Sequence, residues 1–202
     1  LMKIKNLKRF LVFLYRQHIL YPSLNLILKL FFFKSDKRYI YVFHHIPKTA
    51  GTTFNSYLKK NFFLFKDYRL GWTKKINKPF NIKNFNKKCF ISGHFDYYSD
   101  CTAIERYREQ LKAYNKKFKI ITFVRDPLEL KKSLYRYLKT NKQLDKEISL
   151  KKFLFNESNS LAKQLNCNER NFKTVINEYF FIGVTEYIDK SLKSLSKILK
   201  VD

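Results

Sequence analysis

Short apolar runs bounded by polar segments recur along this chain, and they predict buried β-strands. They lie at Tyr39–His44, Cys89–Ser92, Lys119–Val124 and Tyr179–Val184. Between them, residues 104–114 and 188–199 place apolar side chains three or four residues apart, as one face of a helix requires. Strands that alternate with helices predict an α/β fold, in which helices cover both faces of a parallel sheet.

Two longer segments have weaker patterns. Phe62–Lys88 shows no clean period and is expected to be rich in loops, whereas Leu138–Asn171 is expected to be helical in parts. In parallel sheets, ligands bind at the carboxyl ends of the strands, where the loops that precede the helices gather. The residues that follow the predicted strands are therefore the first candidates for a functional site.

The chain has 202 residues, which is enough for one domain with a buried core. We expect this domain at residues 36–202, and an apolar and basic helical segment at residues 1–35. The longest uncharged run of that segment, Gln17–Leu28, is too short to cross about 30 Å of hydrocarbon. Two interpretations of the segment stay open: a helix packed on the core, or a helix lying on an anionic membrane surface.

Composition restricts the class of partner without naming one. The chain's 42 Lys and Arg against 16 Asp and Glu give a formal net charge of +26, which favours polyanionic partners. Its richness in Lys, Asn, Phe, Ile and Tyr also follows from an AT-rich coding sequence, so part of the charge needs no partner. Cys89, Cys101 and Cys167 are widely spaced, which argues against a disulfide framework or a zinc site and suits a reducing compartment.

The loop HHIPKTAGTT, residues 44–53, follows the first predicted strand and leads into a helix. Small residues at Ala50 and Gly51 let the backbone approach a ligand closely. The free N–H groups and the dipole of the following helix favour an anion, and Lys48 adds an ammonium group. The loop is similar to a phosphate-binding loop, but its lysine precedes the glycine, which weakens the interpretation as a nucleoside triphosphatase.

The loop after the third predicted strand carries a second set of polar residues. Arg125 closes the strand, Asp126 is a good helix N-cap, and Pro127 suits the first helical position. Glu129 has the spacing of a capping box. Ser133 falls within the first two turns, so arginine and serine together can bind a second phosphate. Taken alone, the same residues are simply the start of a helix.

Four motifs, in family order, resemble those of the sulfotransferases. HIPKTAGTT at 45–53 is similar to the 5′-phosphosulfate loop of that family, and RDPLELKKSLY at 125–135 resembles its 3′-phosphate motif. FISGHF at 90–95 resembles the segment between them in the Golgi-type carbohydrate branch, which includes the uronosyl 2-O-sulfotransferases. GVTE at 183–186 matches a strand-to-helix turn of the family. Together the matches cover most of the chain.

The resemblance implies a P-loop nucleotide-hydrolase-like sulfotransferase fold. It also implies transfer of a sulfuryl group from 3′-phosphoadenosine 5′-phosphosulfate (PAPS) to an acceptor hydroxyl, without a metal. The 5′-phosphosulfate would be held by Lys48, Thr49, Ala50, Gly51, Thr52 and Thr53. Arg125 and Ser133 would bind the 3′-phosphate, and Lys48 would also stabilise the leaving phosphate oxygen.

His94 is expected to act as the general base. Imidazole titrates near neutral pH, and the family match places a catalytic histidine at this position. His45 precedes the lysine within the first loop and is expected to brace it.

The chain departs from the family pattern at three places. Leu130 stands where the 3′-phosphate motif usually has arginine, and the following Lys131 and Lys132 are candidates to replace its charge. Ala50 replaces a common glycine. Family members often continue further after the helix that follows Glu186, so a domain shortened at its C-terminus is one interpretation of this chain.

The expected acceptor is a hydroxyl of a saccharide or glycolipid, and the basic surface favours an acidic one. We expect a cytoplasmic protein with peripheral contact to an anionic membrane, with Golgi-type membrane anchoring as the alternative. No specific nucleic acid is expected. Two other functions stay open: a kinase-like phosphotransferase that uses ATP with Mg²⁺, and a basic nucleic-acid-binding protein, for which charge is the only support.

Overall fold

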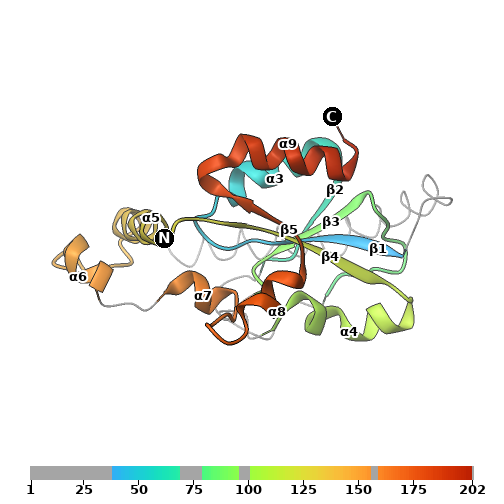
Figure 1. The fold of residues 1–202 in the computed structure, drawn as a ribbon, viewed down its shortest axis with the longest axis horizontal. Coiled ribbons are helices and arrows are strands. Elements are labelled where there is room, and N and C mark those ends of the chain that lie inside the picture. Colours follow the sequence, from blue (N-terminus) through green and yellow to red (C-terminus); the bar gives the residue numbers. More distant parts are fainter. Residues whose placement is uncertain (1–37, 69–78, 96–100, 156–158, 202) are drawn as a thin grey trace, which may run out of the picture.

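The computed structural model describes residues 38–68, 79–95, 101–155 and 159–201. Within these residues, five strands form one parallel sheet in the order β2-β3-β1-β4-β5 (Figure 1). The strands are β1 (Tyr39–His44), β2 (Phe63–Lys66), β3 (Cys89–Gly93), β4 (Lys117–Val124) and β5 (Tyr179–Val184). The predicted α/β fold, a parallel sheet flanked by helices, is confirmed. The predicted segment 1–35 lies outside the described residues.

The strand prediction missed β2. The other four strands agree with the apolar runs to within two residues at each end. β2 is only four residues long and pairs on one side with β3, with Phe63 opposite Cys89. Of its side chains only Phe65 is buried. A short strand at the edge of a sheet leaves little periodic signal in the sequence, which is why 62–88 was expected to be mainly loop.

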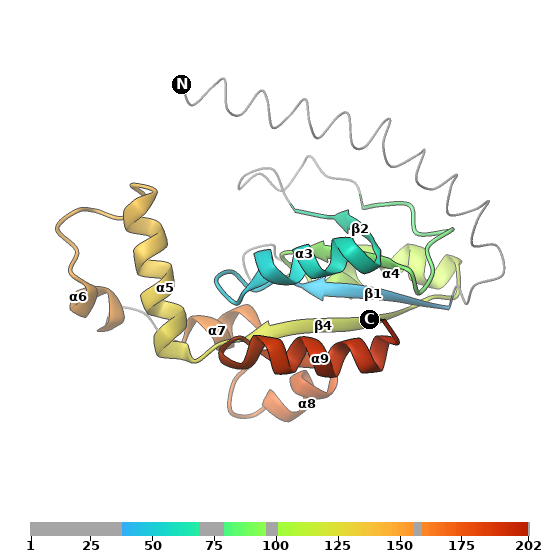
Figure 2. The same ribbon diagram turned by 90° about the horizontal axis from the view of Figure 1, so that it is seen from above.

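Helices cover both faces of the sheet. Figures 1 and 2 show α3 (Gly51–Asn61) and α9 (Ile188–Leu199) on one face, and Figure 1 shows α4 (Ala103–Ala113) and α8 (Phe172–Asn177) on the other. Alternation along β1 supplies both cores, because Val42 packs in the cluster that contains Tyr107 of α4, while Phe43 packs with Leu58 of α3 and Leu195 of α9. The predicted amphipathic helices at 104–114 and 188–199 are thereby confirmed.

The remaining described helices follow β4. They are α5 (Pro127–Thr140), α6 (Leu150–Phe155), α7 (Ser160–Gln164) and the short η3 (Thr185–Tyr187) after β5. This agrees with the expectation that 138–171 is helical in parts. α5 projects beyond the carboxyl ends of β1 and β4 (Figures 1 and 2). None of the described helices is both long and apolar enough to cross a membrane.

The carboxyl ends of the strands meet at one edge of the sheet. His44, at the end of β1, lies opposite Gly93 of β3 and Thr122 of β4. The Thr122 hydroxyl donates to the His44 carbonyl at 2.9 Å, and the His45 N–H donates to the Gly93 carbonyl at 2.9 Å. The loops after β1, β3 and β4 are therefore brought together by strand pairing alone.

A buried ion pair fastens α4 to this edge. Asp67 follows β2 and accepts hydrogen bonds from Nε and Nη2 of Arg106, at 2.7 and 2.8 Å. The Tyr107 hydroxyl donates to the same carboxylate at 2.7 Å. Because the carboxylate is almost fully buried, it depends on these donors to replace the water that it has lost.

Removal of Asp67 is expected to destabilise the domain strongly. Asp67→Ala removes the buried carboxylate that accepts from the Arg106 guanidinium and the Tyr107 hydroxyl, and loss of one member of a buried ion pair costs about 3–5 kcal/mol. Urea unfolding followed by circular dichroism measures the free energy of unfolding. Glu129→Gln is the matched control, because the Lys132–Glu129 pair is solvent-exposed. Equal, small effects of the two substitutions would contradict the role given to Asp67.

Candidate active site

The loop between β1 and α3 has an unusual backbone. Lys48 and Ala50 are both in the left-handed region, with φ of 68° and 61°. This conformation is costly for residues that carry a Cβ. The hydroxyl of the buried Thr49 donates to the Ile46 carbonyl at 2.8 Å, which closes the loop on itself. A ligand therefore meets Thr49 through its backbone, because its side chain already serves the loop.

The start of α3 offers N–H groups without an acidic or capping side chain. Ala50 is the N-cap residue and makes no side-chain cap, and the first turn contains no acidic residue. Thr52 and Thr53 are exposed in that turn. Unsatisfied N–H groups and the positive end of a helix dipole favour an anion. The start of α3 is therefore open to an anion, and the binding role of this loop stays a prediction.

Only glycine fits at position 51, because the His45 side chain occupies the space that a Cβ would need. A Cβ added at Gly51 would lie 1.8 Å from Nε2 of His45, and the rest of the imidazole ring is almost as close. The ring of His45 thus occupies the space over the glycine, inside the loop that it was expected to brace. The sequence suggested close approach of a ligand as the reason for this glycine, whereas the structure provides a reason within the protein itself.

The two predicted loops are in contact. Nη1 of Arg125, at the end of β4, donates to the Lys48 carbonyl at 3.2 Å. Nε of Arg125 lies 3.6 Å from Oε1 of Glu186 and is a buried atom with no hydrogen-bond partner in the described part of the chain. The Lys48 ammonium lies 4.8 Å from the centre of the Tyr137 ring on α5. The structure thus brings Lys48 and Arg125, 77 residues apart in the sequence, into contact.

The cap of α5 is confirmed in part. The Asp126 carboxylate accepts from the N–H groups of Leu128 and Glu129, at 3.0 and 2.9 Å. The reciprocal half of the predicted capping box is wrong, because the Asp126 N–H donates to Glu186 at 3.2 Å. Glu129 instead accepts from the Lys132 ammonium at 2.8 Å. Glu186 had been seen only as part of a turn motif, and its contact with this cap was not predicted.

α5 presents Ser133 on the side of the first loop. Ser133 and Tyr137 are four residues apart, so they share one face of the helix, and Tyr137 contacts Lys48. Leu130 is buried in the protein. Lys131 donates to the Leu154 carbonyl, and Lys132 pairs with Glu129 on its own helix. That these two lysines replace the charge of the missing arginine stays a prediction.

His94 enters the site from the end of β3. Its Nδ1 lies 2.6 Å from the His45 carbonyl oxygen, and its ring stacks on that of His45 with centroids 4.8 Å apart. A carbonyl only accepts hydrogen bonds, so Nδ1 carries the proton and Nε2 keeps the lone pair. This is the arrangement that a general base needs.

Burial keeps the two other described histidines neutral. It lowers the pKa of His44 to about 4 and, with a smaller contribution from the nearby His94, that of His45 to about 3. Nδ1 of His44 lies 2.8 Å from the Tyr179 hydroxyl, and Nδ1 of His45 lies 2.8 Å from the Tyr68 hydroxyl. The positive charge of the site therefore comes from Lys48, Arg125 and the start of α3.

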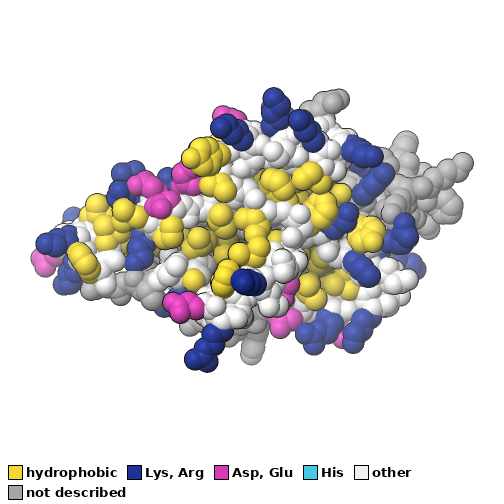
Figure 3. Space-filling model, in the orientation of Figure 1, with side chains coloured by type: hydrophobic (Ala, Val, Ile, Leu, Met, Phe, Trp, Pro, Cys, Tyr) yellow, Lys and Arg dark blue, Asp and Glu magenta, His cyan; other side chains and the backbone are white. Residues whose placement is uncertain are grey.

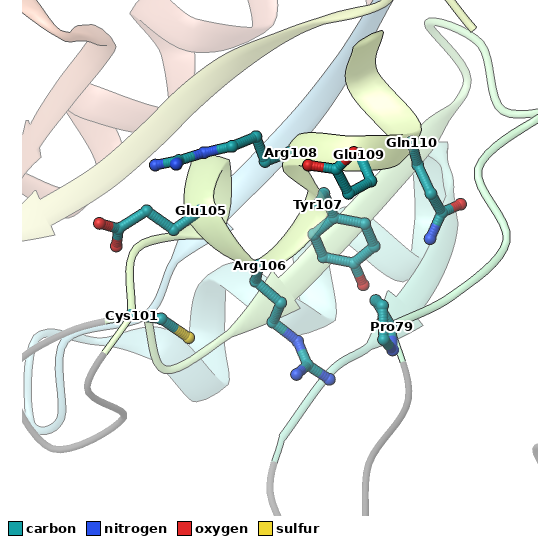
Figure 4. A pocket seen from close by; sticks show the side chains of 8 residues that line it. All are labelled: Pro79, Cys101, Glu105, Arg106, Tyr107, Arg108, Glu109 and Gln110. Atoms are coloured by element: carbon teal, nitrogen blue, oxygen red, sulfur yellow. The ribbon is translucent and has the colours of Figure 1, made fainter. Parts of the chain in front are cut away.

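A cavity of about 560 Å³ lies elsewhere, beside α4 (Figure 4). Its lining includes Cys101, Glu105 and Arg106, and none of the predicted site residues. Arg106 already binds Asp67, and the cavity borders segments outside the described ranges. We therefore assign it no part in the reaction. Within the described ranges, no group of three or more His, Cys, Asp or Glu side chains could hold a metal ion.

Basic side chains do not gather in one patch on the face shown in Figure 3. They lie around its rim, while hydrophobic side chains occupy much of its middle. A concentrated stripe of Lys and Arg is the electrostatic signature of nucleic-acid binding. This face lacks that signature, although the net charge of the whole chain is +26.

Two neighbouring substitutions in the first loop are expected to have opposite effects. Gly51→Ala forces the new methyl group onto His45 and is expected to cost about 1–3 kcal/mol of stability. Ala50→Gly relieves the left-handed backbone and is expected to stabilise the domain by up to about 1 kcal/mol. Urea unfolding measures both changes. Stabilisation by Gly51→Ala would show that the loop is packed differently.

Acid is expected to destabilise the fold through His44 and His45. An exposed histidine in the unfolded chain titrates near pH 6.5, well above the folded pKa values of about 4 and about 3. The unfolded chain therefore binds more protons as the pH falls below about 6.5. Stability is lost by up to roughly 1.4 kcal/mol per pH unit for each histidine. Urea titrations between about pH 7 and 5 measure this slope, which His44→Asn is expected to halve. A flat profile would contradict the burial of both rings.

No protein-family model matches the sequence, and no curated protein gives a significant match. Among solved structures, mouse sulfotransferase SULT7A1 complexed with PAP aligns with a TM-score of 0.47 and 18% identity, over 83% of this chain and 61% of that one. A sulfotransferase from Alicyclobacillus acidocaldarius aligns with a TM-score of 0.49 and 12% identity, over 80% of this chain and 81% of that one. These similarities concern the fold, so we base the functional proposal on the loops.

Proposed function

We propose that this chain is a sulfotransferase that moves a sulfuryl group from PAPS to a hydroxyl of a saccharide or glycoconjugate. The observation that supports this most strongly is that two other motifs contact the β1–α3 loop, which is itself the first motif. Arg125 donates to the Lys48 carbonyl at 3.2 Å, and Nδ1 of His94 donates to the His45 carbonyl at 2.6 Å. These contacts between segments that resemble sulfotransferase motifs support the proposal that they act as one site.

The residues present fit a donor with two separate phosphate positions. The start of α3, with Lys48, Thr52 and Thr53, provides N–H groups, hydroxyls and an ammonium for the 5′-phosphosulfate. Arg125 has a buried Nε without a hydrogen-bond partner in the described residues, which is suited to the 3′-phosphate. Ser133, on the face of α5 that is turned to the first loop, would add a hydroxyl. Glu186 would have to yield the guanidinium to that phosphate.

The chemistry assigned to the protein is charge stabilisation and proton transfer. PAPS supplies a sulfuryl group joined to a phosphate that can leave with the bonding electron pair. His94 Nε2 would accept the proton of the acceptor hydroxyl as its oxygen bonds to sulfur and the sulfur–oxygen bond to the phosphate breaks. Lys48 would neutralise the charge that develops on the leaving phosphate oxygen, as fixed cations do in phosphoryl transfer.

The acceptor class is inferred from the sequence. The FISGHF segment that contains His94 resembles the carbohydrate branch of the family, and a strongly basic chain favours an acidic sugar. A saccharide or glycolipid carrying carboxylates or sulfates is therefore the first acceptor to test. Contact with an anionic membrane would rest on residues 1–35, which lie outside the described ranges.

Three substitutions are expected to separate binding from chemistry. His94→Ala should lower kcat for sulfate transfer from labelled PAPS by about 10²–10⁴-fold with little change in donor affinity, since it removes the general base. Arg125→Ala should weaken binding of 3′-phosphoadenosine 5′-phosphate about 10–100-fold in calorimetry. Lys48→Ala should both weaken donor binding and lower kcat. Lys59→Ala is the control, because Lys59 is exposed in the last turn of α3.

The same measurements distinguish the other functions. Full activity in the Lys48→Ala and Arg125→Ala variants would remove the proposed donor site. Binding of ATP that requires Mg²⁺ and ignores the 3′-phosphate would indicate a kinase-like phosphotransferase. Tight nucleic-acid binding that depends steeply on salt, and that Lys48→Ala leaves unchanged, would indicate a nucleic-acid-binding protein.

A further inference from the structure

A ring of hydrogen bonds lies beneath His45 and contains three polar side chains with no predicted role. Nδ2 of Asn55, on α3, donates to the Tyr68 hydroxyl at 3.0 Å. The Tyr68 hydroxyl lies 2.7 Å from Oγ of Ser92, on β3, and Ser92 donates to Oδ1 of Asn55 at 2.8 Å. Asn55 and Ser92 are buried. A closed polar ring inside the protein indicates a positioning role, because buried polar groups are costly unless each finds a partner.

The direction of every bond in this network follows from counting hydrogens. Oδ1 of Asn55 only accepts, so Ser92 uses its single hydrogen there, and the contact between Tyr68 and Ser92 must use the hydrogen of Tyr68. The remaining contact, 2.8 Å between the Tyr68 hydroxyl and Nδ1 of His45, then needs a hydrogen on Nδ1. The ring thereby assigns one tautomer to His45, with the proton on Nδ1 and the lone pair on Nε2.

His45 contacts His94 in two ways. Its backbone carbonyl accepts from Nδ1 of His94 at 2.6 Å, and the two imidazole rings stack with an interplanar angle of 25°. Tyr68 also touches both rings, with centroid distances of 5.6 Å to His45 and 4.9 Å to His94, and it stands nearly perpendicular to each. The other edge of the His45 ring lies against Gly51.

We propose that Tyr68 is a positioning residue for His94: it fixes the tautomer and orientation of the His45 ring, and the stacked His45 ring in turn orients His94, whose own tautomer is set by the His45 backbone carbonyl. This inference rests on the proposed sulfotransferase function for its chemical meaning. Its geometric part concerns the hydrogens of two histidines and can be measured without any reaction. Tyr68 follows the unpredicted strand β2, so no motif pointed to it.

The arrangement also suits the moment of proton transfer. His94 becomes an imidazolium when it takes the acceptor proton, at a ring distance of 4.8 Å from His45. A second imidazolium in the stack would repel it, whereas a neutral ring does not. Burial lowers the pKa of His45 to about 3, so its ring stays uncharged across the physiological range. His45 thus acts as a stacking partner that does not compete for the proton.

The tautomers can be observed directly by nitrogen-15 NMR of the full chain with labelled histidine. The chain has only four histidines, so single substitutions assign every signal. In the wild type near pH 7, His45 and His94 are both expected to show a protonated Nδ1 and an unprotonated Nε2. A protonated Nε2 with a bare Nδ1 on neutral His94 would overturn the proposal.

Tyr68→Phe removes the hydroxyl and keeps the ring. It is expected to leave His45 in mixed tautomers, while the backbone carbonyl keeps the proton on Nδ1 of His94. We expect kcat to fall by about tenfold or more, because the base is less well oriented. The Kd for 3′-phosphoadenosine 5′-phosphate should change by less than about twofold, since His45, Asn55 and Ser92, which contact the Tyr68 hydroxyl, are not among the residues assigned to the donor. Tyr57→Phe is the matched control, because it deletes a 2.8 Å hydrogen bond to Ser196 on the far side of α3. Unchanged tautomers and kcat in Tyr68→Phe would overturn the proposal.

Ser92→Ala provides an independent test with a smaller change in volume, should Tyr68→Phe fail to fold. Without Ser92, the Tyr68 hydrogen loses its acceptor and can turn to Nδ1 of His45. The His45 signals should then move toward the tautomer with the proton on Nε2, and an unchanged spectrum would contradict the assigned network. If the variants move the tautomers as expected but the wild type transfers no sulfate, the positioning network stands and the proposed reaction is wrong.

Discussion

Parallel pairing on both sides of β1 is the constraint on which the rest of the site depends. β1 lies between β3 and β4, and the register places His44 opposite Gly93 and Thr122. β1 and β3 therefore end level with each other, and β4 ends two residues further on, at Val124. The next residues of the three strands, His45, His94 and Arg125, emerge at one edge. A shift of register by one residue would turn every side chain of the strand to the other face and separate these groups. The site is thus built by the core of the sheet before any polar contact forms.

The charges of the site are divided between fixed and titratable groups. Lys48, Arg125 and the start of α3 supply the positive charge, whereas burial keeps His44 and His45 neutral. The protonation of His44 and His45 therefore does not contribute to the positive potential that acts on an anion in the first loop. His94 lies half-buried at its margin, with its ring held by a backbone carbonyl and a neutral neighbour. Because of this separation, His94 can accept and release a proton without changing the charge of the groups that bind the anion.

The sequence predicted what depends on short-range patterns. Four strands and the amphipathic helices produce strong periodic signals, and the Asp126 cap follows from local turn chemistry. The motifs at 45–53 and 125–135 could be expected to meet, because both follow strands of one parallel sheet.

What the sequence missed depends on contacts between distant residues. Glu186 takes the Asp126 N–H in place of Glu129, although both glutamates have suitable chemistry and Glu129 is closer in sequence. Tyr68 follows an edge strand with little pattern of its own, and its bonds reach residues 13 to 24 positions away. Spacing along the chain contains no information of this kind, since the geometry is set by how α3, β2 and β3 pack together.

The contact between His45 and Gly51 links two positions that belong to different parts of the loop. The imidazole fills the volume in which any larger residue at 51 would place its Cβ. A side chain at 51 is therefore compatible only with a different residue, or a different rotamer, at 45. In evolutionary terms the two positions form one unit, and among relatives of this chain they are expected to change together rather than singly.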